Sequence, residues 1–273
     1  MKNFIPFDRA MIALLFAAAA LVPATATAQT APASLESDKW QFTAALYGYF
    51  PVIKGTVKYP GDLGTSDIDV PFHDLLDHLK MGFMGAFEVR KDRWGMFTDA
   101  LYLNVGGSNS QTNNFMTGAG AVPVTANTSF SFKAWVVTAA GEYRVASDPK
   151  WTVDLLAGAR MLYLNPSLDY TIASSGGGIS GNKHLSKTFW DGIVGIKGRY
   201  ALGDAPGWFV PFYLDVGTGD TAMTWQGITG IGYSFRWGDV VATYRYLDWN
   251  GKSGKSLQDL NLGGPMVGVQ LHF

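Results

Sequence analysis

The side chains best suited to metal binding are those of four histidines: His73, His78, His184 and His272. Asp74 and His78 are four residues apart, so on a helix they would face the same way and offer two ligands. Two ligands are too few for a metal site. Leu75, Leu76 and Leu79 instead favour a short amphipathic helix packed at the mouth of a larger structure. We therefore expect no metal ion and no cofactor.

Hydrolysis is the other chemistry to consider, and it needs a nucleophile or activated water beside a base that a third group orients. His184 lies in a stretch rich in glycine and serine, which is typical of a solvated loop. Asp191 and Asp215 would fall near the same end of two strands, but pairing with arginine or lysine accounts for both. The sequence has no GxSxG element, no glycine-rich phosphate loop and no HExxH run. The residues do not favour an enzyme, and a membrane-embedded hydrolase is the least favoured alternative.

The composition excludes several classes of protein. The 273 residues carry a formal net charge of -1, which offers no footprint for nucleic acid. There is no cysteine, so neither a disulfide framework nor a thiolate metal site is possible. Charged residues make up 16% of the chain, against about 25% in ordinary soluble domains. Aromatic residues make up 14% and glycines number 33, a combination that fits a soluble enzyme poorly.

The N-terminal residues have the features of a secretory signal peptide. Lys2 and Arg9 provide the positive region, and residues 10–22 form an apolar segment too short and alanine-rich for a membrane span. The small residues 26–28 predict cleavage before Gln29, and an uncleaved anchor is the alternative. Beyond this segment no apolar run reaches the roughly 18 residues of a membrane helix.

From Trp40 onward apolar and polar residues alternate in ten runs of about ten residues. We expect strands at 40–50, 81–90, 94–104, 130–145, 151–165, 188–201, 208–216, 223–237, 240–249 and 265–273. An even number of strands of this length predicts an all-β fold, a transmembrane antiparallel up-and-down β-barrel. Counts of eight or twelve stay open, because residues 55–70 would add an extracellular hairpin.

The predicted connections alternate between short and long. The short ones are residues 91–93, 146–150, 202–207 and 238–239, and the long ones are 51–80, 105–129, 166–187 and 250–264. Only the short connection 217–222 breaks the alternation. This layout predicts long extracellular loops, short periplasmic turns and both termini in the periplasm of a Gram-negative cell. The expected organisation is a signal peptide (1–28), a periplasmic lead (29–39) and an outer-membrane barrel (40–273).

Aromatic residues collect at the ends of the predicted strands. One set marks the periplasmic rim: Trp40, Trp94, Tyr143, Trp151, Tyr200, Trp208, Trp237 and Phe273. A second set marks the opposite rim: Tyr49, Tyr102, Tyr163, Trp190, Trp225 and Trp249. Two such belts are expected where tryptophan and tyrosine meet lipid headgroups. Core aromatics of a soluble sandwich, the alternative, have no reason to gather at strand ends.

The charges distinguish the lipid face from the lumen. In the fifth strand Leu155 lies on an apolar face, whereas Asp154 and Arg160 lie on the other face. The charged residues that we assign to the lumen are Glu88, Arg90, Asp99, Glu142, Arg144, Asp154, Arg160, Asp191, Lys197, Arg199, Asp215, Arg236 and Arg245. These charges predict either a salt-bridge network that fills a narrow barrel, which we favour, or a charged constriction that selects solutes. We expect Leu155→Arg to block assembly and Asp154→Asn to be mild.

The C-terminal segment Pro265–Phe273 resembles the last strand of Gram-negative outer-membrane proteins, which typically ends in Phe. That resemblance implies recognition by the barrel-assembly machinery. The stretches 213–220 and 238–248 resemble a group of porin-like barrels of undefined role, and the match brings no catalytic motif. The implied function is a porin-like passive channel for small solutes or a structural envelope component, in contact with outer-membrane lipid and lipopolysaccharide. The alternative is a cell-surface interaction protein that binds through its loops.

Overall fold

A computed structural model describes residues 39–58, 65–70, 79–117, 120–174, 177–203, 205–255 and 257–273. These residues belong to one compact unit, Ala31–Phe273. The predicted signal peptide and the predicted loop helix with His73 and His78 lie outside the described residues. No helix in the described ranges is long and apolar enough to cross a membrane.

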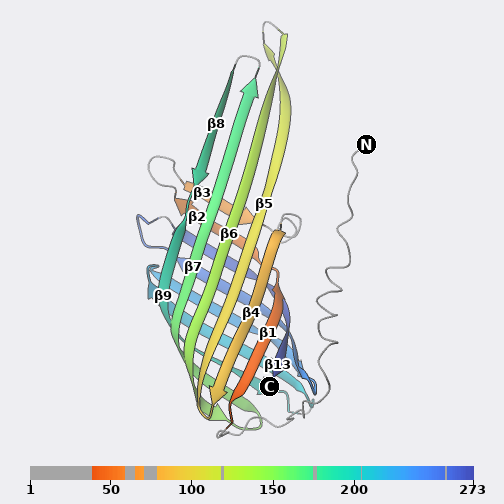
Figure 1. Ribbon diagram of the computed structural model, residues 1–273, viewed down its shortest axis with the longest axis vertical. Coiled ribbons are helices and arrows are strands. Elements are labelled where there is room, and N and C mark those ends of the chain that lie inside the picture. Colours follow the sequence, from red (N-terminus) through yellow and green to blue (C-terminus); the bar gives the residue numbers. More distant parts are fainter. Residues whose placement is uncertain are drawn as a thin grey trace. The chain divides into compact units, whose positions relative to one another are not determined.

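Ten antiparallel strands close into a barrel (Figure 1). They are β1 (Gln41–Tyr49), β4 (Leu79–Lys91), β5 (Trp94–Thr117), β6 (Gly120–Ser147), β7 (Trp151–Ser174), β9 (Lys187–Ala201), β10 (Trp208–Gly219), β11 (Met223–Ser234), β12 (Gly238–Asn250) and β13 (Leu257–His272). Each pairs with the next, and β13 pairs back onto β1 from Thr43↔His272 to Tyr49↔Met266. The prediction of an all-β, up-and-down barrel of ten strands is confirmed.

The closing seam involves the last residue of the chain. Phe273 and Phe42 exchange backbone hydrogen bonds of 2.9 and 3.0 Å. Their rings stack with centroids 5.8 Å apart. The C-terminal Phe therefore holds the first and last strands together at the barrel's seam.

The segment that suggested a higher strand count forms a hairpin outside the ring of ten. Strands β2 (Val52–Lys58) and β3 (Thr65–Val70) pair with each other, and β2 also pairs with β13. The pair Val52↔Gly263 continues the register that Tyr49↔Met266 sets for β1. Thus β2 prolongs β1 along β13 past Pro51, and its other neighbour is β3 instead of β4. Among the described residues β3 pairs with no strand other than β2. The hairpin therefore adds no strand to the ring of ten.

Strands β5, β6 and β7 run far beyond the barrel body (Figure 1). The β5–β6 ladder continues to Thr117↔Gly120, and β7 pairs at its far end with β8 (Gly177–His184). Two of the predicted long connections thus consist largely of strand. Serine, threonine, asparagine and glycine are frequent in these segments and are typical of loops. The alternation of Leu168, Tyr170 and Ile172 with polar residues is nevertheless a local strand signal on β7. We call four segments together the projecting sheet. They are residues 103–117 of β5, residues 120–134 of β6, residues 164–174 of β7 and the whole of β8.

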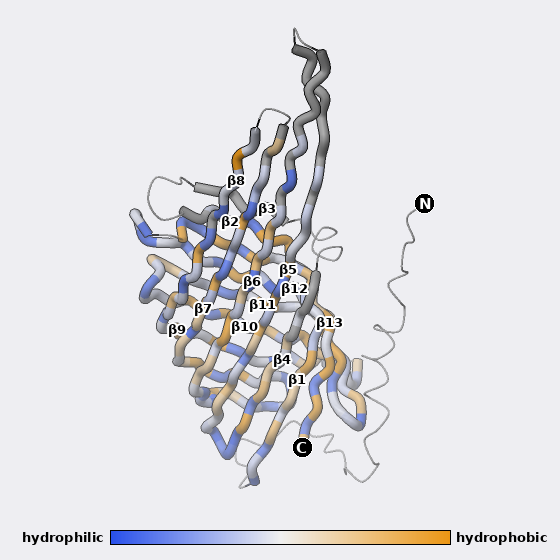
Figure 2. The backbone as a smooth tube through the Cα atoms, turned by 45° about the horizontal axis from the view of Figure 1, so that its top comes forward, coloured by the Kyte–Doolittle hydropathy of each residue, from blue (hydrophilic) through white to orange (hydrophobic). Residues whose placement is uncertain are grey.

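The short connections lie together at one end of the barrel, the turn end, where hydrophilic residues gather in Figure 2. Near this end cross-strand aromatic pairs recur: Trp94↔Tyr143, Trp151↔Tyr200 and Trp208↔Tyr233, with ring centroids 4.8, 4.5 and 5.1 Å apart. The opposite end, the loop end, has a second aromatic row in which Tyr102 pairs with Trp135, and Trp135 with Tyr163.

The two aromatic levels are separated by a membrane-sized distance. Trp94 and Tyr102 are eight residues apart on β5, which at about 3.3 Å per residue and the usual barrel tilt is roughly 20 Å along the barrel axis. Between them the wall exposes apolar side chains such as Leu155 (48% exposed) and Val194 (59%). Tyr49 and Trp249 were predicted in the outer belt, but they are 2% and 0% exposed. That prediction is wrong, because both residues share the strand parity of the inward-facing side chains.

An arginine on the outer wall tests whether this wall faces lipid. Leu155→Arg is expected to destabilise the folded barrel by about 2–4 kcal/mol, since an apolar band cannot solvate the charge. Val145 is equally exposed (45%) but lies beyond Tyr143 toward the turn end, so Val145→Arg should cost only about 0–1 kcal/mol. Urea unfolding of protein folded in lipid vesicles measures both changes. Equal costs would contradict a lipid-facing wall between the aromatic levels.

Candidate functional site

The barrel interior changes in character along its length. Each strand places alternate side chains inside, and those between the two aromatic levels include Asp99, Asp154 and Arg160. Toward the loop end the inward residues become apolar. The resulting apolar cluster comprises Tyr49, Ile53, Leu101, Leu103, Val105, Phe132, Ala134, Val136, Leu162, Leu164, Leu185, Phe189, Leu247, Trp249, Leu257, Leu260, Leu262 and Met266. The charges of the interior were predicted from the sequence and this cluster was not, although period-two alternation locates its strand members as well.

Six charged residues form a turn-end network: Glu88, Arg90, Glu142, Arg144, Asp154 and Lys197. Arg90 Nη2 donates to carboxylate oxygens of Glu88 at 2.9 Å, Glu142 at 2.7 Å and Asp154 at 2.7 Å. Arg144 adds a bidentate pair to Asp154, from Nε at 2.8 Å and Nη2 at 3.0 Å. Lys197 Nζ donates to Glu88 at 2.6 Å and also pairs with Glu142. Three cations balance three carboxylates, so the network is neutral.

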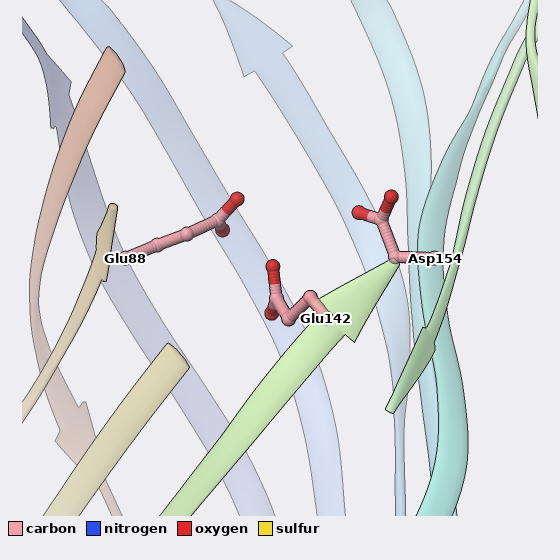
Figure 3. Close-up of side chains that lie close together, drawn as sticks. All are labelled: Glu88, Glu142 and Asp154. Atoms are coloured by element: carbon pink, nitrogen blue, oxygen red, sulfur yellow. The ribbon is translucent and has the colours of Figure 1, made fainter. Parts of the chain in front are cut away.

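The three carboxylates of this network approach one another closely (Figure 3), with ligand atoms within 4.8 Å. A cation held there would have to compete with Arg90 and Lys197 for the same oxygens. Buried charges are stable when each is paired and hydrogen-bonded. The arrangement therefore favours an ion-pair network over a metal centre.

A second group, the central network, is built around Arg160 and Arg245, neither of which is exposed. Arg160 pairs with Asp215 and also donates to Thr138 at 3.3 Å and Thr224 at 3.2 Å. Arg245 Nη2 donates to Asp99 at 2.7 Å and to Gln226 at 2.9 Å, while Nη1 donates to the Tyr47 hydroxyl at 3.1 Å. Tyr47 in turn donates to Asp99. Here two arginines balance two aspartates.

These bonds cross the interior from wall to wall. In the ring of ten strands β5 and β12, which carry Asp99 and Arg245, are separated by three strands on the shorter way round. Three strands likewise separate β4 and β9, which carry Glu88 and Lys197. Hydrogen bonds between such distant strands can only run through the lumen. The interior is therefore bridged at two levels and packed with apolar side chains at a third.

Polar residues at the turn-end rim form a smaller group. Asp239 pairs with Arg199 Nη1 at 3.3 Å and with His272 Nε2 at 3.0 Å. The other ring nitrogen of His272 lies 3.0 Å from the Thr43 hydroxyl. Asp239 was interpreted as a turn residue, yet β12 already begins at Gly238, so its carboxylate is buried beneath the rim.

Other predicted lumen residues have different surroundings from those expected. Arg236 is exposed in the turn after β11, which ends at Ser234, so it does not lie on the inner face of the strand. Asp191 is buried and accepts from the backbone and hydroxyl of Thr221, both at 2.9 Å, which fastens the short β10–β11 connection. Asp191 and Asp215 therefore have separate structural partners, Thr221 and Arg160.

Comparison with proteins of known structure places the fold. The outer-membrane protease OmpT from Escherichia coli matches with a TM-score of 0.52 and 12% identity, covering 88% of this chain and all of that one. The fold is that of an outer-membrane β-barrel. The translocator domain of the autotransporter NalP from Neisseria meningitidis (TM-score 0.40, 16% identity, 97% and 95% of the two chains) and Neisserial surface protein A (0.31, 14%, 86% and 97%) are further matches.

At 12% identity the likeness to OmpT establishes the fold and nothing about activity. No protein-family model matches the sequence, and no curated protein does. The interior networks, described from this chain's own residues, are therefore the basis for any functional inference.

The central network predicts a strong dependence of stability on charge pairing. Arg160→Met leaves Asp215 buried without its cation and should destabilise the barrel by about 3–5 kcal/mol. The double variant Arg160→Met/Asp215→Leu should recover most of that loss, since no charge is then stranded. Urea unfolding in lipid vesicles measures the cycle, with the exposed Lys133→Met as a control expected within about 0.5 kcal/mol of wild type. A double variant as unstable as the sum of the single variants would show that the pair is not coupled.

The bonds of Asp154 also revise an expectation from the sequence. Asp154→Asn was expected to be mild because the residue faces the lumen. Its carboxylate accepts from both Arg90 and Arg144, so neutralising it leaves the turn-end network with one uncompensated cation. We now expect a substantial loss of stability.

Proposed function

We propose that this protein is a sealed outer-membrane barrel that presents its projecting sheet at the cell surface for contact with other molecules. The observation that carries the proposal is the length of the strands. Beyond the aromatic row, β5 continues for fifteen residues from Tyr102 to Thr117, which is roughly 50 Å of strand. Crossing the bilayer needs only about ten residues. A barrel that served only to span the membrane has no use for the remainder.

The orientation in this proposal puts the loop end outside the cell and both termini in the periplasm. Short turns at one rim and long connections at the other support it, as this is the usual layout of such barrels. The seam that Phe273 makes with Phe42 supports a role for the C-terminal strand as the segment recognised during barrel assembly.

The chemistry of the projecting sheet indicates what kind of contact it makes. Residues 106–130 contain no Asp, Glu, Lys or Arg and are rich in serine, threonine, asparagine and glycine, and the remaining described residues of the sheet add only Lys133, Asp169 and Lys183. Such a surface binds through hydrogen bonds and shape, and not through the long-range steering that charges provide. Binding should accordingly depend only weakly on salt.

A passive channel is the second candidate, and one observation favours it. Several buried polar atoms of the interior have no protein partner among the described residues, including Arg90 Nη1, Thr243 Oγ1 and Trp249 Nε1. Buried polar groups of this kind usually bind water, which would suit a narrow hydrated path. The wall-to-wall bonds of Arg245 and Lys197 nevertheless obstruct the lumen for solutes larger than water.

Conductance in planar bilayers separates the two candidates. The wild-type protein is expected to show no steady current, because side-chain bonds bridge the lumen. Steady wild-type conductance would favour the channel and overturn the sealed barrel.

Shortening the projecting sheet tests the surface role. Ser108↔Ser129 and Leu168↔Lys183 are register pairs, so Asn-Gly turns can replace residues 109–128 and 169–182 without changing the pairing below them. Cells displaying the full-length protein should aggregate or attach to coated surfaces equally at low and high salt. Cells with the shortened barrel, verified as folded by heat-modifiability, should lose this attachment. Unchanged attachment would contradict the proposal.

A further inference from the structure

The projecting sheet has an open edge along β5. Pairing of β4 with β5 ends at Leu79↔Val105, whereas pairing of β5 with β6 continues to Thr117↔Gly120. Among the described residues, β5 therefore has no second neighbour from Gly106 to Thr117. An edge strand presents a row of unpaired backbone N–H and C=O groups to its surroundings. Here that row is roughly 40 Å long, enough to hold a second strand of the same length.

The β5 edge has none of the features that usually keep sheet edges from pairing. Edge strands are commonly protected by charged side chains, above all lysine, or by proline. Two other edges that are open among the described residues carry charges: β3 has Asp67 and Asp69, and β8 has Lys183. Residues 106–117 contain no charged residue and no proline. The β5 edge is therefore the one best suited to accept another strand.

The residues of this edge also suit pairing with a copy of itself. Residues 108–114 consist entirely of serine, asparagine, glutamine and threonine. Asparagine and glutamine side chains add hydrogen bonds between paired strands. Ser108 and Ser110 are exposed, so a second strand can reach them. Because residues 106–117 carry no charge, two copies of the edge do not repel each other.

The direction of β5 determines where such a copy must be. Strand β5 runs from the turn end toward the loop end, and β6, β7 and β8 follow it with alternating direction. A second β5 continues this alternation if it is related to the first by a two-fold axis perpendicular to the sheet, near Gln111 or Thr112. The two barrels then point in opposite directions. Barrels in one membrane point the same way, so their β5 edges could meet only in parallel, which is the slightly weaker pairing.

We infer that the β5 edge pairs antiparallel with the β5 edge of a second copy in a facing membrane. The inference rests on the proposed surface role and names the partner for it. The contact is isologous, since the same segment of each copy contributes to it. The two projecting sheets become one continuous antiparallel sheet. The facing membranes would be at most about 65 Å apart, the length of strand from Tyr102 of one copy to Tyr102 of the other.

Docking of vesicles tests the inference with the purified protein. Neutral phosphatidylcholine vesicles that carry the wild-type barrel should bind one another but not protein-free vesicles. Thr112→Lys and Thr112→Glu should each abolish docking at low salt, because residue 112 lies opposite or diagonal to its copy and like charges then meet. Mixing Thr112→Lys vesicles with Thr112→Glu vesicles should restore docking, since opposite charges then meet. Electron cryomicroscopy measures the spacing of the docked membranes.

The matched control is Asn127→Lys, which adds the same charge one strand away from the edge. Asn127 of β6 is the register partner of Ser110 and therefore lies on the same face of the sheet as residues 110 and 112. Vesicles with this variant should dock as the wild type does, and heat-modifiability verifies that each variant is folded.

Three outcomes would overturn the inference. Docking that survives both charged variants would mean that the β5 edge is not the contact, and binding to protein-free vesicles would identify lipid as the partner. Wild-type vesicles that stay dispersed while cells displaying the protein attach to coated surfaces would exclude the second copy and leave the proposed surface role intact. Absence of attachment in both assays would contradict the surface role as well.

Discussion

Every backbone N–H and C=O that meets the hydrocarbon of a bilayer must be hydrogen-bonded within the protein, and the rest of this structure follows from that constraint. An open sheet would leave two bare edges in lipid. Here β13 returns to β1, and Phe273 completes the seam with Phe42. Closure forces alternate side chains outward into lipid and inward into a narrow space, so each strand must satisfy two different environments.

The inward environment explains the pairing of charges. A ten-stranded barrel has little interior beyond what its side chains occupy, and a lone charge in such a space would be costly. Arg160 therefore needs Asp215, and Arg245 needs Asp99 together with Tyr47 and Gln226. Both networks are neutral as a consequence. The bonds that pair these charges also join distant strands across the lumen. The same interactions therefore stabilise the buried charges and obstruct the lumen.

Much of this was predictable from the sequence, because period-two alternation is a local signal. Ten strands, their order and the inward position of residues such as Arg160 follow from it. Partner choice does not, since Arg245 and Asp99 are 146 residues apart and only closure of the ring brings them together. Trp249 was misassigned although it shares the parity of Arg245, because the tendency of aromatics to mark rims was given more weight than parity. The strands of the projecting sheet were missed for another reason: serine, threonine, asparagine and glycine are frequent in them, and that composition is typical of loops.

The same constraint explains where the barrel stops being closed. Strand β5 has two neighbours as far as Val105, where β4 begins to pair with it; in the described residues beyond that point it pairs with β6 alone. Val105 is three residues past Tyr102, which belongs to the aromatic row of the loop end. On β7 the change from β9 to β8 as the neighbour occurs between Leu164 and Ser167, just past Tyr163. A sheet edge is tolerated in water and not in lipid. Strand pairing and the positions of the aromatic residues are independent features of the barrel. Because the ring stops being closed at the level of the aromatic row, we infer that the projecting sheet begins where the membrane ends.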